Sequence, residues 1–71
     1  MRFNKVKIGM KRVSTGYAVY EEWYRDGQLV SSTELGMIFR NAFEARRGME
    51  ELARVVRRRE PDVAVEFDRA A

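Results

Sequence analysis

The sequence contains neither cysteine nor histidine. Without cysteine there is no disulfide bond and no thiolate metal ligand, and without histidine the commonest general base and metal ligand is missing. Small secreted domains usually depend on disulfides, so this composition favours a cytoplasmic protein. We predict that the protein binds no metal and no other cofactor.

Long apolar runs are also absent. No stretch approaches the roughly 20 residues that a membrane-spanning helix needs, and the basic N-terminal stretch MRFNKVKIGMKR is not followed by the apolar block of a signal peptide. The 71 residues, of which 45% are hydrophobic, suffice for one folded domain over residues 1–71. We expect a soluble domain that does not associate with membranes.

Catalysis is not expected. An enzyme without histidine or cysteine would have to use carboxylates, tyrosine, serine or lysine, and no motif here prepares such a group. Glu21 and Glu22 are adjacent, but neighbours on a strand point to opposite faces and do not share a proton or a metal. The five glycines form no phosphate-binding loop. The sequence therefore predicts a binding protein rather than an enzyme.

Apolar and polar side chains alternate along the N-terminal half. Residues 3–13 alternate apolar side chains with lysines, which predicts a half-buried strand, and residues 17–25 and 28–32 are two further β-rich runs. Asp26 and Gly27, between the last two runs, are typical of a type I′ turn, which needs positive φ at both central positions. The pattern predicts a three-stranded antiparallel sheet.

The C-terminal half is predicted to form a helix and a fourth strand. Ser31 followed three residues later by Glu34 fits a capping box, which opens a helix over residues 33–59 that ends before Pro61. Residues 63–67 alternate again, as expected of a short strand. The expected fold class is α+β, a small βββαβ domain whose antiparallel sheet packs on one long helix.

The two-residue hairpin loop divides the side chains of the sheet into two faces. It sets Tyr24 opposite Leu29 and Trp23 opposite Val30, unless a bulge in either strand exchanges the two faces. Trp23 and Val30 offer the larger apolar contact, so their face is assigned to the core. The other face, away from the helix, then carries the following side chains: Lys5, Lys7, Lys11, Tyr20, Glu22, Tyr24 and Leu29.

The apolar arc of the predicted helix is wide, roughly 180°. Either a second copy of the chain covers the extra width in a homodimer, or the fourth strand and the loops do. Arg46 falls within this arc, so either its charged group reaches outward or the helix kinks near Gly48. The candidate interface residues, which include one from the outer sheet face, are Leu29, Leu35, Ala42, Met49 and Val56.

The outer sheet face suggests nucleic-acid binding. Residues 1–14 hold five lysines and arginines and no acidic residue. Lysines neutralise phosphates, and exposed tyrosines stack on bases. The competing explanation is that Lys5 and Lys7 pair with Glu66 and Asp68 on an adjacent fourth strand. The candidate contacts are Lys5, Lys7, Lys11, Arg12, Tyr20, Tyr24 and Arg25.

A second basic cluster ends the predicted helix. Spacings such as Arg46 to Glu50 and Arg47 to Glu51 indicate a salt-bridged, exposed helix, and the arginines of its last turn complement the helix dipole. Arg57 and Arg58 are also candidate phosphate contacts.

Two functions are consistent with these features. The first is a small nucleic-acid-binding protein, with DNA favoured over RNA, acting as a transcriptional or accessory factor of a prokaryote or its virus. The second is a small adaptor or inhibitor that binds a larger host protein complex through the same aromatic face. Several DNA-binding proteins use a sheet backed by helices, but this is an analogy of fold alone.

Overall fold

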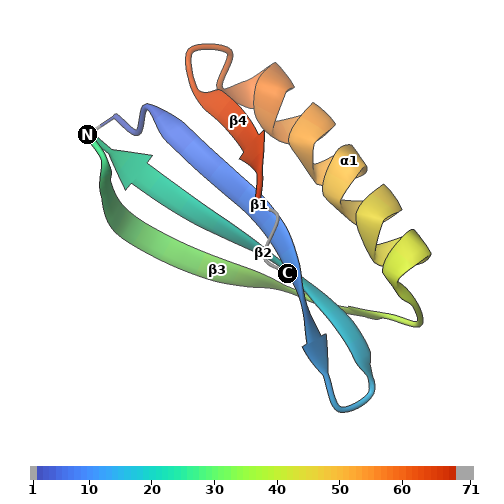
Figure 1. The fold of residues 1–71 in the computed structure, drawn as a ribbon. Helices are drawn as coiled ribbons and strands as arrows, with labels where there is room; N and C mark the ends of the chain where they lie inside the picture. The colour runs from blue at the N-terminus through green and yellow to red at the C-terminus, as the bar shows by residue number, and fades with distance from the viewer. Residues whose placement is uncertain (1, 69–71) are drawn as a thin grey trace.

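The computed structural model describes residues 2–68. Four strands form one mixed sheet in the order β3-β2-β1-β4, and one helix covers a single face of it (Figure 1). Strands β1, β2 and β3 are antiparallel neighbours, whereas β4 is parallel to β1. The predicted α+β class and βββαβ order are confirmed. The elements are β1 (Lys5–Val13), β2 (Gly16–Arg25), β3 (Gln28–Phe39), α1 (Ala42–Arg59) and β4 (Ala64–Phe67).

The turn between β2 and β3 has the predicted backbone. Asp26 and Gly27 both have positive φ, 51° and 82°, as a type I′ turn requires. The side chain of Asn4 holds this turn, because its Oδ1 accepts a hydrogen bond from the Asp26 amide at 3.3 Å. The local signal of the Asp-Gly pair was therefore sufficient to place this hairpin.

Strand β3 is longer than predicted. It extends to Phe39, so the prediction of a helix starting at Thr33 is wrong. A strand that ended at residue 32 would have left the first half of β2 without a partner on that side, and pairs such as Tyr17 with Phe39 fill this gap. Tertiary pairing thus outweighs the capping signal at Ser31.

The helix begins ten residues after that signal. Asn41 is the N-cap, and its Oδ1 accepts a hydrogen bond from the Glu44 amide at 2.9 Å. The helix continues through Gly48 to Arg59, where it was predicted to end. Gly48 makes room for an aromatic ring, since a Cβ there would lie 2.6 Å from Cζ of Phe39. The predicted kink at Gly48 stays a prediction.

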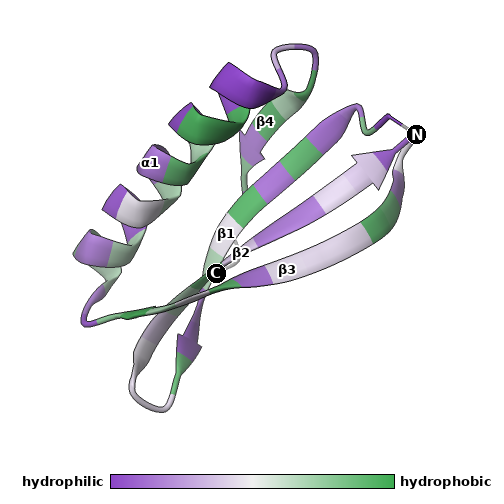
Figure 2. Cartoon of the chain, turned by 180° about the vertical axis from the view of Figure 1, so that it is seen from behind, coloured by the Kyte–Doolittle hydropathy of each residue, from purple (hydrophilic) through white to green (hydrophobic). Residues whose placement is uncertain are grey.

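The core lies between α1 and the helix-facing side of β1 and β2. Val6, Ile8 and Val19 are fully buried there, as the alternation predicted, and Figure 2 shows the alternation of hydropathy along β1. The helix and the loop after it contribute the remaining residues of this buried cluster: Ala45, Met49, Ala53, Val56 and Val63.

One predicted core residue is not in the core. Val30 is 45% exposed, because a bulge follows the Tyr24–Leu29 pair and makes Val30 an extra residue. Ser31 lies opposite Trp23 in its place. Beyond this bulge Tyr20 pairs with Glu34 rather than lying near Thr33.

Candidate functional site

The sheet face away from α1 gathers five of the predicted contact residues. Lys5 is paired with Tyr24, and Lys7 with Glu22, so these side chains share one face. Strands β4 and β3 add carboxylates to it. We call this surface the outer sheet face; its charged and aromatic members are Lys5, Lys7, Lys11, Tyr20, Glu22, Tyr24, Glu34, Glu66 and Asp68.

Tyr24 is in contact with charged groups at its ring and at its hydroxyl. The ammonium groups of Lys5 and Lys7 lie 4.9 and 5.4 Å from the ring centroid, within range of a cation–π interaction. The Tyr24 hydroxyl donates to Glu22 Oε1 at 3.3 Å, and partial desolvation together with that carboxylate raises the pKa of Tyr24. The ring and its hydroxyl therefore already have partners within the chain.

Tyr20 is held more firmly. Its hydroxyl donates to Asp68 Oδ2 at 2.7 Å, across strand β1. Its ring lies over Gly9, whose missing side chain makes the space, since a Cβ there would overlap the ring. Burial raises the pKa of Tyr20 well above its ordinary value, and the bonded carboxylate of Asp68 adds to the shift. This tyrosine is not free to stack on a base.

The outer sheet face carries no excess of positive charge. Lys11 forms an ion pair with Glu34 of β3, and Lys7 is the registered neighbour of Glu66 on β4. In the described part of the chain this face holds three lysines and four carboxylates. Lys7 lies next to the fourth strand, as the competing explanation predicted, whereas Asp68 bonds to Tyr20 rather than to a lysine.

Arg12 and Arg25 do not join this surface. Arg12 is paired with Tyr17 near the β1–β2 turn, whereas Arg25 is paired with Gln28 beside the β2–β3 turn. Strand alternation turns both toward the helix side of the sheet. Arg12 in β1 lies beside the start of β2 and Arg25 lies at its end, so they cannot contact one phosphate group together with the lysines.

The exposed side of α1 is different in charge. The helix contains six arginines and three glutamates. Arg54, Arg57 and Arg58 are exposed and lie three and four residues apart, which makes them neighbours on one helix face. Arg54 contacts Glu51 at 2.9 Å, an ion pair in which both side chains are about two-thirds exposed. Over residues 2–68, Arg57 and Arg58 have no ion-pair partner.

The predicted interface residues are distributed over several environments. Met49 and Val56 are buried in the core of their own chain, and Ala42 is half-buried. Leu35 belongs to β3 and packs against the same core. Only Leu29 is well exposed, at 52%. The helix seam is thus occupied within the domain.

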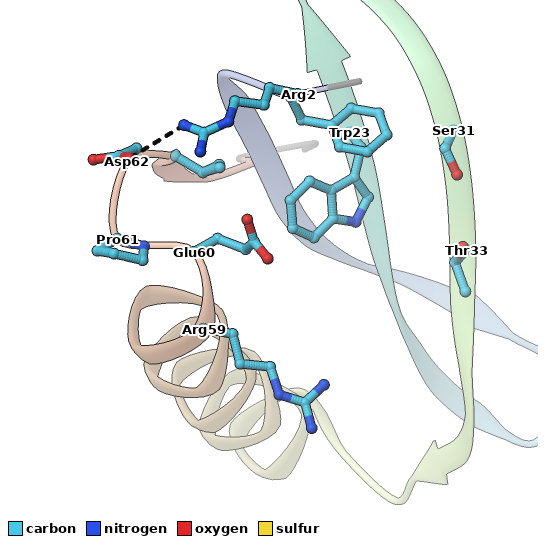
Figure 3. A pocket seen from close by; sticks show the side chains of 10 residues that line it. Arg2, Trp23, Ser31, Thr33, Arg59, Glu60, Pro61 and Asp62 are labelled. Carbon is cyan, nitrogen blue, oxygen red and sulfur yellow. Dashed lines mark ion pairs between the residues drawn. The ribbon is translucent and has the colours of Figure 1, made fainter.

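A cavity of about 600 Å³ lies between the end of α1 and the edge of the sheet (Figure 3). Trp23 forms one wall, with Phe3 packed against its indole at a centroid distance of 5.3 Å. Arg59 and Glu60 extend from the helix end, and the indole Nε1 donates to Glu21. Two arginines and two carboxylates line this cavity, so its lining has no net charge that would select an ionic ligand.

The residues that the structure describes include no cluster of His, Cys, Asp or Glu suited to a metal ion. Among the same residues no helix has the length and hydropathy needed to span a membrane. Comparisons with protein-family models, curated proteins and solved structures find no match to this chain. The function must therefore be argued from the surface itself.

Arg54 was missed as a site residue in the sequence. The signal that identifies it is the i, i+3, i+4 spacing of Arg54, Arg57 and Arg58, which puts three guanidinium groups on one face of any helix that includes them.

Proposed function

We propose that the protein binds nucleic acid, DNA in preference to RNA, through the arginines on the exposed face of α1. The observation that carries this proposal is the cluster of Arg54, Arg57 and Arg58, exposed in the last two turns of the helix with only Glu51 as a close acidic partner in the described chain. Arginine contacts phosphate with two parallel hydrogen bonds, so a cluster of this kind fits a sugar–phosphate backbone.

The preference for DNA follows from the shape of the binding element. An exposed α-helix fits the major groove of B-form DNA, whereas the major groove of A-form RNA is too narrow for it. Arginine is also the side chain that most often contacts guanine in the major groove, but the proposal here concerns its contacts to phosphates, which are expected to depend strongly on salt.

The test is fluorescence anisotropy with a labelled duplex, comparing two triple variants that remove the same charge. R54Q/R57Q/R58Q removes three arginines from α1, and K5Q/K7Q/K11Q removes three lysines from the outer sheet face. If about four phosphates are contacted, the parent protein should lose about 10²-fold in affinity between about 50 mM and about 200 mM salt. The helix variant should lose most of the binding, and the sheet variant little of it.

Each other outcome contradicts the proposal. Equal losses in both variants would mean that net charge alone drives binding. A larger loss in the sheet variant would move the site to the outer sheet face. No binding at low salt to duplex or single-stranded DNA would remove the nucleic-acid function.

A protein partner for the outer sheet face is the second candidate. The observation in its favour is the balance of charge on that face, combined with exposed apolar side chains such as Leu29 and Ile38. Balanced charges and aromatic rings are typical of protein interfaces rather than of phosphate-binding surfaces. Under this proposal Tyr24→Ala weakens complex formation more than Lys5→Gln does, as measured by co-purification and calorimetry with the captured partner.

A further inference from the structure

Strand β3 is an unprotected edge of the sheet. Among residues 2–68 it pairs only with β2, on one side, and it has twelve residues, whereas the other edge, β4, has four. Long edge strands are usually protected by lysine, proline or a covering element, because their free backbone groups pair with other chains. Strand β3 contains no lysine, arginine or proline.

The single charge on this strand is neutralised within the chain. Glu34 is the one charged residue of β3, and its carboxylate forms an ion pair with Lys11. Two copies of the strand could therefore approach each other without strong repulsion, although the protein as a whole carries a net charge of +3.

The apolar side chains of β3 lie at its two ends. Leu29 and Val30 are 52% and 45% exposed at one end, and Met37 and Ile38 are 59% and 51% exposed at the other. They account for four of the six large hydrophobic side chains that are exposed in the described chain. The six residues from Ser31 to Gly36 separate the two ends, and the first three of them carry hydroxyl side chains.

This arrangement is complementary to itself. When a second copy of β3 runs antiparallel with the centre of pairing at Thr33, Leu29 of one copy lies opposite Met37 of the other. In the same register Ser31 lies opposite Leu35, and Ser32 opposite Glu34. Within one copy, Ser31 and Leu35 point to the same side of the sheet, and so do Ser32 and Glu34. Residues that lie directly opposite each other in an antiparallel pair must point to the same side, so this register is allowed.

The bulges of β3 limit the pairing between two copies but do not prevent it. One bulge lies at Val30 and the other lies between Glu34 and Ile38, the partners of Tyr20 and Ala18. The pairing of β3 with β2 is therefore regular from Ser31 to Glu34. This central segment would form the hydrogen-bonded ladder between the copies, and the apolar ends would pack on each side of it.

We propose that the protein forms a homodimer through its β3 edge, in which the two sheets join into one continuous sheet of eight strands. The two-fold axis of an antiparallel strand pair is perpendicular to the sheet, so both helices lie on the same side of it. The arginine clusters of both copies then face one way, while dimer formation itself does not depend on nucleic acid.

The experiment is sedimentation velocity of the free protein from about 1 µM to about 1 mM, with two variants that differ only in the sign of one charge. L29K/M37K places like charges opposite each other across the two-fold axis, whereas L29E/M37K places opposite charges there. Residues 29 and 37 are roughly 26 Å apart along one strand, at about 3.3 Å per residue, so they cannot pair within a copy. Both positions are exposed, so each variant retains the fold.

The parent protein should be dimeric at the upper concentrations, L29K/M37K should be monomeric, and L29E/M37K should be dimeric again. F43K/E50Q adds the same charge as L29K/M37K on α1, away from β3, and should remain dimeric. A monomeric parent protein throughout, an equal loss of dimer in both β3 variants, or a loss in the helix variant would overturn the proposal. Because no nucleic acid is present, these results are independent of the DNA-binding test.

Discussion

The outer sheet face and the exposed face of α1 both carry many charges, but their charges have different partners. On the sheet face, Tyr20 bonds to Asp68 and Lys11 pairs with Glu34, so cations and hydroxyls have partners from distant parts of the chain. On the helix, Arg57 and Arg58 have none among the described residues. The comparison teaches that a run of basic residues becomes a candidate site only when the fold leaves it unpaired.

The two faces also differ in whether their side chains are packed against other parts of the chain. On the sheet, Gly9 provides the space beneath Tyr20, and the ring is fixed by a hydrogen bond at its far end. The arginines of the helix face have no such packing and remain extended into solvent. We therefore expect changes to the packing of Tyr20 on the sheet face to change stability, and substitutions of the arginines on the helix face to change binding.

The largest effect on stability is expected from Gly9→Val. The new side chain would displace the ring of Tyr20 and break its bond to Asp68, at a cost of about 2 to 3 kcal/mol in the free energy of unfolding. Urea denaturation followed by circular dichroism measures this loss. Gly36→Ala is the matched control, since a Cβ there meets no atom within 4 Å, and it should change stability by less than about 0.5 kcal/mol. Equal effects of the two changes would show that Tyr20 is not seated on Gly9.

Tyr20→Phe tests the hydrogen bond alone, with an expected loss of about 1 kcal/mol at neutral pH. The raised pKa means that the folded state holds the phenol proton more tightly than the unfolded chain does. This stabilisation is complete below the ordinary value of 10.0 and is lost as the pH rises above it. Denaturation at neutral pH and above pH 10 should thus show a steeper alkaline loss in the parent protein than in the variant. Identical pH profiles would contradict the raised pKa of Tyr20, and with it the burial of the phenol beside the Asp68 carboxylate.

Asn41→Ala tests where the helix begins. Removing the side chain that caps the Glu44 amide should cost about 1 kcal/mol in thermal or chemical denaturation. Ser31→Ala is the control, because Ser31 lies in β3 and caps no helix, so its effect should be close to zero. A larger loss of stability in Ser31→Ala than in Asn41→Ala would instead support a helix that starts near residue 33.

Lys11→Gln should have the smallest effect. Its ion pair with Glu34 is about half exposed, and such pairs contribute between about 0 and 1 kcal/mol. Chemical denaturation should give nearly the parent stability, and DNA affinity should also change little. A large loss of DNA affinity would assign the site to the outer sheet face and remove the contrast between the two regions.

The sequence by itself determined those features that depend on neighbouring residues. The Asp26–Gly27 turn follows from the positive φ that this pair tolerates, and the buried face of β1 follows from the alternation of Val6 and Ile8 with lysines. The end of the helix at Arg59, before Pro61, is also a local signal. In each case the physical cause lies within a few residues along the chain.

Only the tertiary structure decided the length of β3, the start of α1 and the charge of the outer sheet face. Ser31 and Glu34 satisfy a helix-capping pattern, yet the unpaired edge of β2 draws this segment into the sheet. Tyr20 and Asp68 are 48 residues apart, and no local pattern predicts their bond. A sequence pattern indicates what a segment can form by itself. Buried backbone and polar groups must find hydrogen-bond partners, so pairing across the sheet determines which backbone groups and which charges remain without a partner.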